Sequence, residues 1–522
     1  MILIQGFALF VFACSHCAAV LHCLHMFQLN SYKVGVQLRW LAKNKSDWLH
    51  KNAAALLIFP LLFLSAKDGV IFAFSFVFYL AQLWRNRPRQ AKKPLVYTNR
   101  VKRTLATYGL FLVAVLALSL RVGDLRAQTA CLAIAHLLTP AFVLLADWVN
   151  SPLEKLINRR YVEDARRRLH EHPGLLVVGV TGSYGKTSTK FFLHKLLSLK
   201  YDVLTTPESF NTTLGVVRTL RERLKPFHEV FVCEMGARNP GDIKEICEIV
   251  KPRHGILTAI GPQHLESFKS LERIVETKFE LADALPNDGA VFLNLSNEHV
   301  RSEYLRRGKK GRTVTYGFSD DCDYRARDVV TSGEGSSFFV RMPDSVEVPF
   351  ETKLIGAHNV ENVLGAVAVA DFLGVDRKAV AMGVRRLESV PHRLQLIRHG
   401  GGVLIDDAYN ANSAGAKAAL DVLALFDGCK ILVTPGMIEL GTRQDELNEK
   451  FGAQASQVCD FVILVGKRQT ESIRKGLTDA GYPQEKIFVA DGISQALAKA
   501  AELDAVGRQK VVLLENDLPD NF

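Results

Sequence analysis

The stretch LLVVGVTGSYGKTSTK, residues 175–190, decides the fold of this chain. It begins with an apolar run typical of a buried parallel strand, continues through a glycine-containing turn, and ends where Lys186 and Thr187 open a helical pattern. In such a turn the backbone N–H groups and the helix N-terminus hold an anion, the lysine reaches the terminal phosphates, and the threonine hydroxyl binds Mg²⁺. The sequence therefore predicts a phosphate-binding loop.

The spacing of this loop differs from the general G-x-x-x-x-G-K-[ST] pattern. The first glycine of that pattern would fall at Val180, and the loop here is T-G-x-x-G-K-T. Its place between a strand and a helix makes a chance match much less frequent than for G-K-T alone. We expect a bound nucleotide to contact Thr181, Gly182, Ser183, Tyr184, Gly185, Lys186, Thr187 and Ser188.

After Gly174 the chain alternates short apolar runs with helical patterns, as α/β proteins do. We expect a P-loop central domain with a parallel sheet over 174–390, in which 311–354 forms short antiparallel strands. A C-terminal Rossmann-like α/β domain is expected over 391–522. Its strands are predicted at 403–406, 430–433, 461–465, 486–489 and 511–514.

The first part of this 522-residue chain instead carries long apolar segments, at Ile2–Phe27, Ala53–Ser65, Val70–Trp84, Thr104–Leu120 and Ala130–Trp148. The first lacks the basic start and the small-residue cleavage site of a removable signal peptide. We expect a helical membrane bundle over 1–150 and a charged helical linker over 151–173. The second and third segments are shorter than the roughly 20 residues that a span needs, so a re-entrant hairpin is an alternative for them.

Positive charges set the expected topology. Lysines and arginines gather between the first and second segments and again between the third and fourth, which predicts that both loops are cytoplasmic. We therefore expect a multi-pass protein of the bacterial cell membrane, with five passages and cytoplasmic catalytic domains. The net charge of +11 suits contact with anionic membrane lipid. No basic patch is interleaved with aromatics after residue 174, so nucleic acid is not an expected partner.

Several polar clusters follow the predicted strands, where α/β proteins bind ligands. Taken singly, each has an ordinary explanation. Considered alone, Glu234 is more often a helix-capping carboxylate, His264 a core histidine and Lys278 an exposed helix lysine.

The order of these clusters is more specific. EMGARNPGDI at 234–243, IDDAYNAN at 405–412 and GMIELG at 436–441 resemble motifs of the Mur ligase family, the ATP-dependent amide ligases of peptidoglycan precursor assembly. The D-alanyl-D-alanine-adding, MurF-type branch is the most similar. The resemblance runs from Gly174 to the C-terminus.

The resemblance implies a role for each matching residue. Lys186 would hold the β- and γ-phosphates of ATP, Thr187 and Glu234 one Mg²⁺, and His264 a second Mg²⁺. Lys278 matches the family lysine that is carbamylated, which would make it an anionic oxygen ligand of the kind that Mg²⁺ prefers.

The same resemblance assigns the remaining site residues. His358, Asn359 and Asn362 would contact the adenine. Arg393 would contact the γ-phosphate, and Asp407 would contact the nucleotide from the C-terminal domain. The residues that would contact the substrates are Asn211, Thr212, Tyr409, Asn410 and Asn412. Lys186, Lys278, His264 and Arg393 would be the catalytic residues.

The implied reaction forms an amide bond. A peptide carboxylate of a cell-wall precursor attacks the γ-phosphate, and the acyl phosphate is then attacked by the amine of D-Ala-D-Ala or of an amino acid. Because anions must approach one another, nearby cations would carry most of the catalysis, and closure of the C-terminal domain would complete the site.

Departures from the family leave the carboxylate substrate open. The family's UDP-sugar-binding domain is missing, the chain ends in LLENDLPDNF where the MurF type carries K-G-S-R, and Ser413 stands where the family has proline. The precursor is therefore either UDP-linked or lipid-linked. A membrane transport ATPase and a regulatory nucleotide-binding protein are the alternatives from other classes.

Overall fold

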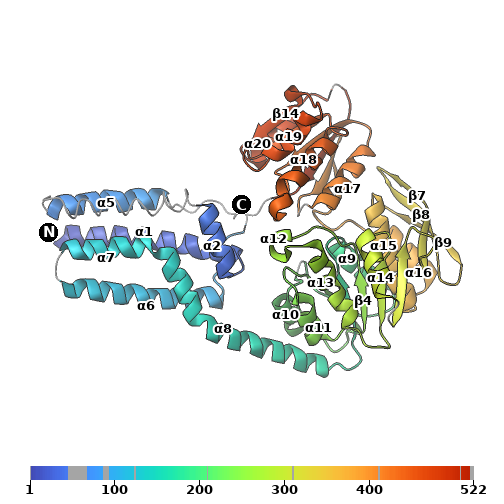
Figure 1. Ribbon diagram of the computed structural model, residues 1–522, viewed down its shortest axis with the longest axis horizontal. Helices are drawn as coiled ribbons and strands as arrows, with labels where there is room; N and C mark the ends of the chain where they lie inside the picture. The colour runs from blue at the N-terminus through green and yellow to red at the C-terminus, as the bar shows by residue number, and fades with distance from the viewer. Residues whose placement is uncertain are drawn as a thin grey trace. The chain divides into compact units, whose positions relative to one another are not determined.

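The computed structural model describes residues 2–44, 68–85, 93–122, 125–208, 210–308, 311–409, 412–505 and 507–517. The chain divides between Arg159 and Arg160 into two compact units, each of which is considered on its own. Figure 1 labels the helices and strands.

The N-terminal unit is helical. Its elements are α1 (Ile2–Leu29), α2 (Val34–Lys43), α5 (Asp68–Arg85), α6 (Asn99–Val122), α7 (Leu125–Leu137) and the first part of α8 (Thr139–His170). Helix α1 packs against α5, and α6 packs against α7. A buried chain of polar side chains joins them, since the Tyr108 hydroxyl lies 2.8 Å from His16 Nε2 and His16 Nδ1 lies 3.4 Å from His136 Nδ1.

The prediction of a multi-pass membrane protein with five passages is wrong. Among the described residues, two helices are long and apolar enough to cross a membrane, Phe10–Leu29 and Asn99–Leu118. A third would require counting Arg126–Leu137 and Thr139–His170 as one span, although they are bent by 68°. The predicted segment Ala53–Ser65 lies outside the described residues. The predicted lipid partner, which rested on this topology and on the net charge of +11, is not supported.

The second unit begins with the last part of α8, so the predicted helical linker is indeed helical. A nine-stranded sheet follows, in the order β2-β3-β1-β4-β5-β6-β7-β8-β9. Its strands are β1 (Leu176–Thr181), β2 (Val203–Thr205), β3 (Val230–Glu234), β4 (His254–Leu257), β5 (Ala290–Asn294), β6 (Arg312–Gly317), β7 (Tyr324–Ser332), β8 (Gly335–Arg341) and β9 (Glu347–Thr352).

This central sheet is mixed rather than wholly parallel. The strands from β2 to β7 pair in parallel, and β7, β8 and β9 pair antiparallel. The antiparallel prediction for 311–354 is therefore correct for its later strands, whereas β6 continues the parallel part. Alternation of buried and exposed residues along β7 and β8 fits strands with one face in the core.

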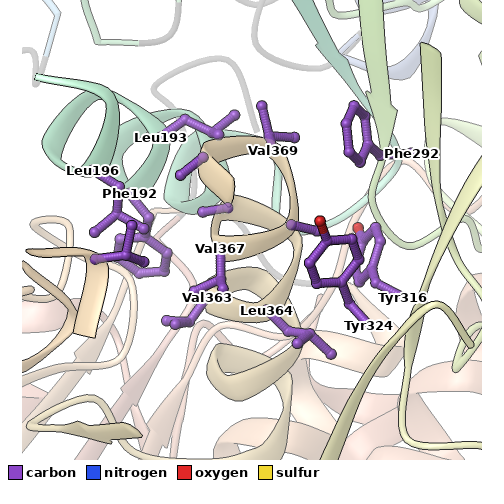
Figure 2. Close-up of a cluster of buried hydrophobic side chains, with 14 of the residues drawn as sticks. Phe192, Leu193, Leu196, Phe292, Tyr316, Tyr324, Val363, Leu364, Val367 and Val369 are labelled. Atoms are coloured by element: carbon purple, nitrogen blue, oxygen red, sulfur yellow. The ribbon is translucent and has the colours of Figure 1, made fainter. Parts of the chain in front are cut away.

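Helices cover the central sheet. They are α9 (Lys186–Leu197), α10 (Thr213–Arg223), α11 (Asp242–Val250), α12 (Leu265–Phe268), α13 (Leu271–Asp283), α14 (Glu298–Arg307), α15 (Ala357–Phe372) and α16 (Arg377–Arg385). Figure 2 shows apolar side chains of α9 and α15 facing one another beside aromatic rings of β5, β6 and β7. Burial of these side chains fixes α15 against α9, the helix that starts at the phosphate-binding loop.

A second sheet forms the C-terminal part, in the order β10-β11-β15-β12-β13-β14. Its strands are β10 (Gln395–His399), β11 (Gly402–Asp407), β12 (Cys429–Thr434), β13 (Phe461–Val465), β14 (Ile487–Ala490) and β15 (Lys510–Glu515). Only β10 is antiparallel to its neighbour. The helical elements are α17 (Ser413–Ala424), η2 (Gly441–Arg443), α18 (Gln444–Ala455), α19 (Glu471–Asp479), η3 (Gln484–Lys486) and α20 (Ile493–Glu502).

Candidate active site

The phosphate-binding loop joins β1 to α9 and depends on its two glycines. Gly182 has φ +152°, and a Cβ there would lie 2.0 Å from Thr258 Oγ1. Gly185 has φ +76°, and a Cβ there would lie 2.2 Å from Asn362 Oδ1. Side chains at these positions would clash and strain the backbone, so the loop needs glycine at both.

Other loop residues hold the turn in place. The backbone N–H groups of Ser183 and Tyr184 donate to the Ala259 carbonyl at 2.7 and 3.1 Å. The hydroxyls of Thr181, Ser183 and Tyr184 donate to the carbonyls of Met235, Gly261 and Pro262. These bonds anchor the loop to the ends of neighbouring strands, so that its shape is set before any ligand binds.

Lys186 folds back over the loop. Its ammonium donates to the carbonyls of Gly182 at 2.8 Å and Ser183 at 2.9 Å. Burial lowers the pKa of Lys186 to about 8, against the opposing charge of Glu234, and the positive charge of Arg393 lowers it further. A lysine held at this place can move to phosphate oxygens without leaving the loop.

Glu234 ends β3 and is the acidic centre of the site. Its Oε1 accepts hydrogen bonds from Thr187 Oγ1 at 3.2 Å and Asn211 Nδ2 at 2.9 Å, and Oε2 forms an ion pair with Lys190 Nζ at 2.9 Å. Burial acts to raise the pKa of Glu234, but the charges of Lys190 and Lys186 lower it overall. The carboxylate therefore stays ionised although it is buried.

Lys190 was not among the residues predicted from the sequence. It lies four residues after Lys186 on α9, a spacing that places both side chains on one face of the helix. That spacing is the signal that sequence reasoning missed.

Lys278 lies on α13 with only 2% of its surface exposed. Within the described part of the chain no hydrogen bond or ion pair reaches its ammonium. Burial lowers the pKa of Lys278 well below its usual value, and the charge of Lys186 lowers it further. Burial therefore favours the neutral amine of Lys278, and it excludes the interpretation of an exposed helix lysine.

His264 precedes α12 in the left-handed region, at φ 52°. Its Nδ1 lies 2.5 Å from Glu439 Oε2, and Arg238 Nη1 lies 3.8 Å from Glu439 Oε1. Burial lowers the pKa of His264, although Glu439 opposes this effect. The predicted metal ligand thus contacts a carboxylate of the GMIELG motif, a residue to which the sequence analysis gave no role.

The residues present fit Mg²⁺ better than a metal that takes all of its ligands from protein side chains. The described residues contain no group of three or more His, Cys, Asp or Glu side chains able to hold a metal ion. Thr187 and Glu234 do bring a hydroxyl and a carboxylate together at 3.2 Å. Mg²⁺ is usually held by one or two carboxylates together with substrate phosphates, and this pair suits that mode.

The predicted adenine-side residues divide into two kinds. Asn362 faces the loop, because its Oδ1 accepts from Thr189 Oγ1 at 3.3 Å and lies close to Gly185. Asn359 is buried and donates to the Ile355 carbonyl at 2.9 Å, which secures the start of α15. Burial lowers the pKa of His358 to about 4, so its imidazole is neutral.

Arg393 precedes β10, and Asp407 ends β11, the strand that pairs with β10. The Arg393 guanidinium stacks on the Tyr409 ring at 4.1 Å. Asp407 Oδ1 accepts from the Leu394 N–H at 3.2 Å. Burial raises the pKa of Asp407 to about 6, against the opposing charge of Arg393, and the same charge contributes to the lowered pKa of Lys186.

Three predicted substrate residues have other tasks or cannot be placed. Thr212 caps α10 by accepting from Gly215 N at 3.3 Å, and Asn412 caps α17 by accepting from Gly415 N at 2.8 Å. Asn410 lies outside the described residues. Tyr409 remains exposed, and Asn211 contacts Glu234.

A phosphate-binding loop, a lysine–carboxylate cluster and a second sheet domain beside them define an ATP-dependent ligase. Comparison with known proteins agrees: the Mur ligase middle domain matches residues 180–370, and the Mur ligase glutamate ligase domain matches residues 392–515. This chain belongs to the Mur ligase family.

Curated relatives support the same branch. The UDP-N-acetylmuramoyl-tripeptide–D-alanyl-D-alanine ligase of Bacillus subtilis (strain 168) is 33% identical over 329 residues, which cover 62% of this chain and 68% of that protein. The enzyme of the same name from Escherichia coli (strain K12) is 31% identical over 334 residues, which cover 61% of this chain and 72% of that protein.

Solved structures agree with this assignment. MurF from Acinetobacter baumannii superposes with a TM-score of 0.62 at 25% identity, over 68% of this chain and 77% of that one. The MurF ligase of Thermotoga maritima in complex with ADP superposes with a TM-score of 0.61 at 28% identity, over 69% of this chain and 80% of that one. The similarity favours a ligase over the transport ATPase and the regulatory protein considered above.

Proposed function

We propose that this chain joins D-alanyl-D-alanine to the peptide carboxylate of a UDP-linked muramoyl tripeptide, with ATP as the energy source. The substrates are those that the names of the relatives describe. The observation that carries the proposal is the cluster of Lys186, Glu234 and Lys278 beside the phosphate-binding loop. Residues 174–390 would bind ATP, and 391–522 would supply Arg393 and the amine site.

Charge neutralisation is the main task of such a site. The carboxylate attacks the γ-phosphorus, an O–P bond forms, and the bond to ADP breaks. Lys186 and Arg393 would hold the phosphate oxygens as negative charge moves through them. Thr187 and Glu234 would hold Mg²⁺, which when bound neutralises phosphate charge.

Lys278 would act as a carbamate. A neutral lysine amine can attack CO₂, forming an N–C bond and releasing a proton, and the product is an anion with two oxygen donors. The burial and the lowered pKa of Lys278 favour the neutral amine that this reaction needs. The negative carbamate would then balance the positive charge of Lys186 and supply a further ligand for Mg²⁺.

The second half of the reaction transfers the acyl group. The amine attacks the acyl carbon, a C–N bond forms, and phosphate leaves. The reaction needs the two substrates within about 3–3.5 Å of one another. The contact between His264 and Glu439 supports closure of the GMIELG loop over the central domain as the step that achieves this.

Phosphate release by the purified full-length protein tests the proposal. It should require ATP, Mg²⁺, the UDP-linked tripeptide and D-alanyl-D-alanine together, and omission of either substrate should abolish it. Lys186→Ala should abolish release, whereas Lys195→Ala, at an exposed position of the same helix, should not. Hydrolysis at full rate without either substrate would contradict a ligase.

A further inference from the structure

Two carboxyl groups meet at the C-terminal ends of two neighbouring central strands of the second sheet. Asp407 ends β11 and Glu515 ends β15, and the two residues are direct partners in the parallel register of these strands. Glu515 is fully buried, and neither of its carboxyl oxygens accepts a hydrogen bond. A buried carboxylate without any donor is costly, so the state of Glu515 needs an explanation.

Among the described charged groups around Asp407 and Glu515, the cation that acts on them is Arg393. Burial raises the pKa of both carboxyls, that of Asp407 to about 6, and the charge of Arg393 opposes this rise. Asp406, next to Asp407 on β11, is itself bound to His392 at 2.7 Å. Asp517 follows two residues after Glu515.

The other elements packed against β15 add no cation to the pair. On α17, Lys417 and Asp421 are exposed and pair with each other at 2.8 Å. On β12, the neighbour of Leu514 is the apolar Val433. Arg393 is therefore the cation within the described residues that acts on the pair.

Arg393 does not bind either carboxyl directly. Among the described residues no ion pair within 4.0 Å joins it to Asp407 or Glu515, and it stacks instead on Tyr409 at 4.1 Å. If both carboxyls were ionised, their combined charge would draw the guanidinium between them. Arg393 thus leaves the pair without a direct cationic partner, and two unpaired buried charges would be costly.

Two carboxyls in contact cannot both ionise cheaply, and in such pairs the pKa of one member is strongly raised. Burial and the charge of Asp407 raise the pKa of Glu515 well above its usual value. Asp407 already accepts the Leu394 N–H, as the ionised member of a pair would. The deeper burial of Glu515 and the N–H that Asp407 accepts favour Glu515 as the member that keeps the proton.

We propose that Glu515 is a positioning residue of the ligase site, which remains protonated, donates its carboxyl hydrogen to Asp407 and thereby leaves Arg393 free to face the phosphate-binding loop. The link to the γ-phosphate rests on the function proposed above, whereas the protonation of Glu515 does not. Loss of this proton should pull Arg393 toward the carboxyls and weaken its contact with a triphosphate.

Infrared spectroscopy of the full chain tests the proton directly. Wild-type protein at neutral pH should show the carbonyl-stretch band of a buried protonated carboxylic acid, and Glu515→Gln should lose the contribution of Glu515 to it. Glu334→Gln, at an exposed side chain, is the control that should leave the band unchanged. Because burial also raises the pKa of Glu361, the decisive quantity is the difference between the two spectra. A band that is absent from the wild type, or that is unchanged in Glu515→Gln, overturns the proposal.

Binding measurements test the role of Arg393 without any turnover. The affinity of β,γ-imido-ATP relative to ADP isolates the γ-phosphate contact. In the wild type this ratio should fall about tenfold as alkaline pH ionises Glu515, the scale of one lost charge contact. In Glu515→Gln, whose amide cannot ionise, the ratio should stay constant. Parallel pH dependence in the two proteins would show a merely structural residue.

A second variant keeps the test decisive if Glu515→Gln fails to fold. Asp407→Asn removes the neighbouring negative charge, so the carboxylic acid band of Glu515 should titrate at lower pH than in the wild type. An unchanged titration would contradict the pairing of the two groups. Because the infrared band needs no activity, a failed ligase assay would leave this result standing.

Discussion

The ammonium of Lys190 lies 2.9 Å from Oε2 of Glu234, and both side chains are buried. This ion pair fixes the one carboxylate that also contacts Thr187 and Asn211. The ionised state and the position of the Glu234 carboxylate thus depend on Lys190 of α9, which was not predicted as a site residue.

Removal of Lys190 should destabilise the protein. Lys190→Ala leaves the buried charge of Glu234 without its partner, and losing one member of a buried pair costs about 3–5 kcal/mol. Denaturant unfolding measures the loss. Lys195→Ala on the same helix is the matched control and should change the free energy of unfolding by less than about 0.5 kcal/mol. Equal stabilities for the two variants would show that the ion pair contributes nothing.

Lys186→Ala should lose most catalysis with little change in fold. By analogy with a single lost oxyanion donor, the expected cost is roughly 3–4 kcal/mol of transition-state stabilisation. Steady-state kinetics measures it as a fall in kcat/KM, with circular dichroism to confirm folding. A loss below tenfold would remove Lys186 from the chemical step.

Lys278→Ala should lose most activity, because the substitution removes the amine that the proposed carbamate needs. High bicarbonate should not restore the variant, whereas a short-chain carboxylic acid should restore part of its rate by taking the vacated volume. Lys251→Ala, at an exposed position, is the control and should retain wild-type rates. Near-normal turnover in Lys278→Ala would contradict a catalytic role.

Gly185→Ala should abolish nucleotide binding, measured by calorimetry with ADP. The added Cβ would strain a backbone at φ +76° and lie 2.2 Å from Asn362 Oδ1. Gly241→Ala separates the two effects, because Gly241 has φ +89° but no atom within 4 Å of its added Cβ. The control should lose only about 1 kcal/mol of stability and bind ADP normally. If Gly185→Ala binds ADP as well, the contact with Asn362 does not shape the loop.

The pH dependence of stability should reveal Glu515. Its pKa is raised in the folded protein, so the stability that it contributes is present below the unfolded pKa and is lost as pH rises toward the folded value. The amide of Glu515→Gln does not ionise, so the variant does not lose stability in this way. The variant should therefore become more stable than the wild type as pH rises from about 5, by up to about 1.4 kcal/mol per pH unit. Denaturation curves at several pH values measure the difference, and a constant difference would contradict the raised pKa.

The sequence by itself determined the parts of the fold that are local. A strand, a glycine turn and a helix lie within residues 175–190, and short-range sterics suffice to define the phosphate-binding loop there. Predicted strands such as 461–465 lie where the structure has them, because continuous apolar runs mark strands buried on both faces. The order of the EMGAR, DDAYNAN and GMIELG motifs was also sufficient to indicate the family.

Hydropathy was a poor guide at the N-terminus. Hydropathy measures composition along a window and not the path of the backbone. It therefore predicts one passage over Ala130–Trp148, although the chain bends by 68° between α7 and α8. Length and charge patterns therefore predicted five passages where the described residues contain two qualifying helices.

Tertiary structure alone decided the partners of the site residues. Asn362 reaches the loop because α15 packs on α9, His264 meets Glu439 across 175 residues of chain, and Glu515 lies beside Asp407 because β15 enters the sheet between β11 and β12. Such contacts follow from strand order and helix packing, which depend on the burial of the whole core. No local pattern contains that information, and the charge states of Glu234, Lys278 and Glu515 depend on it.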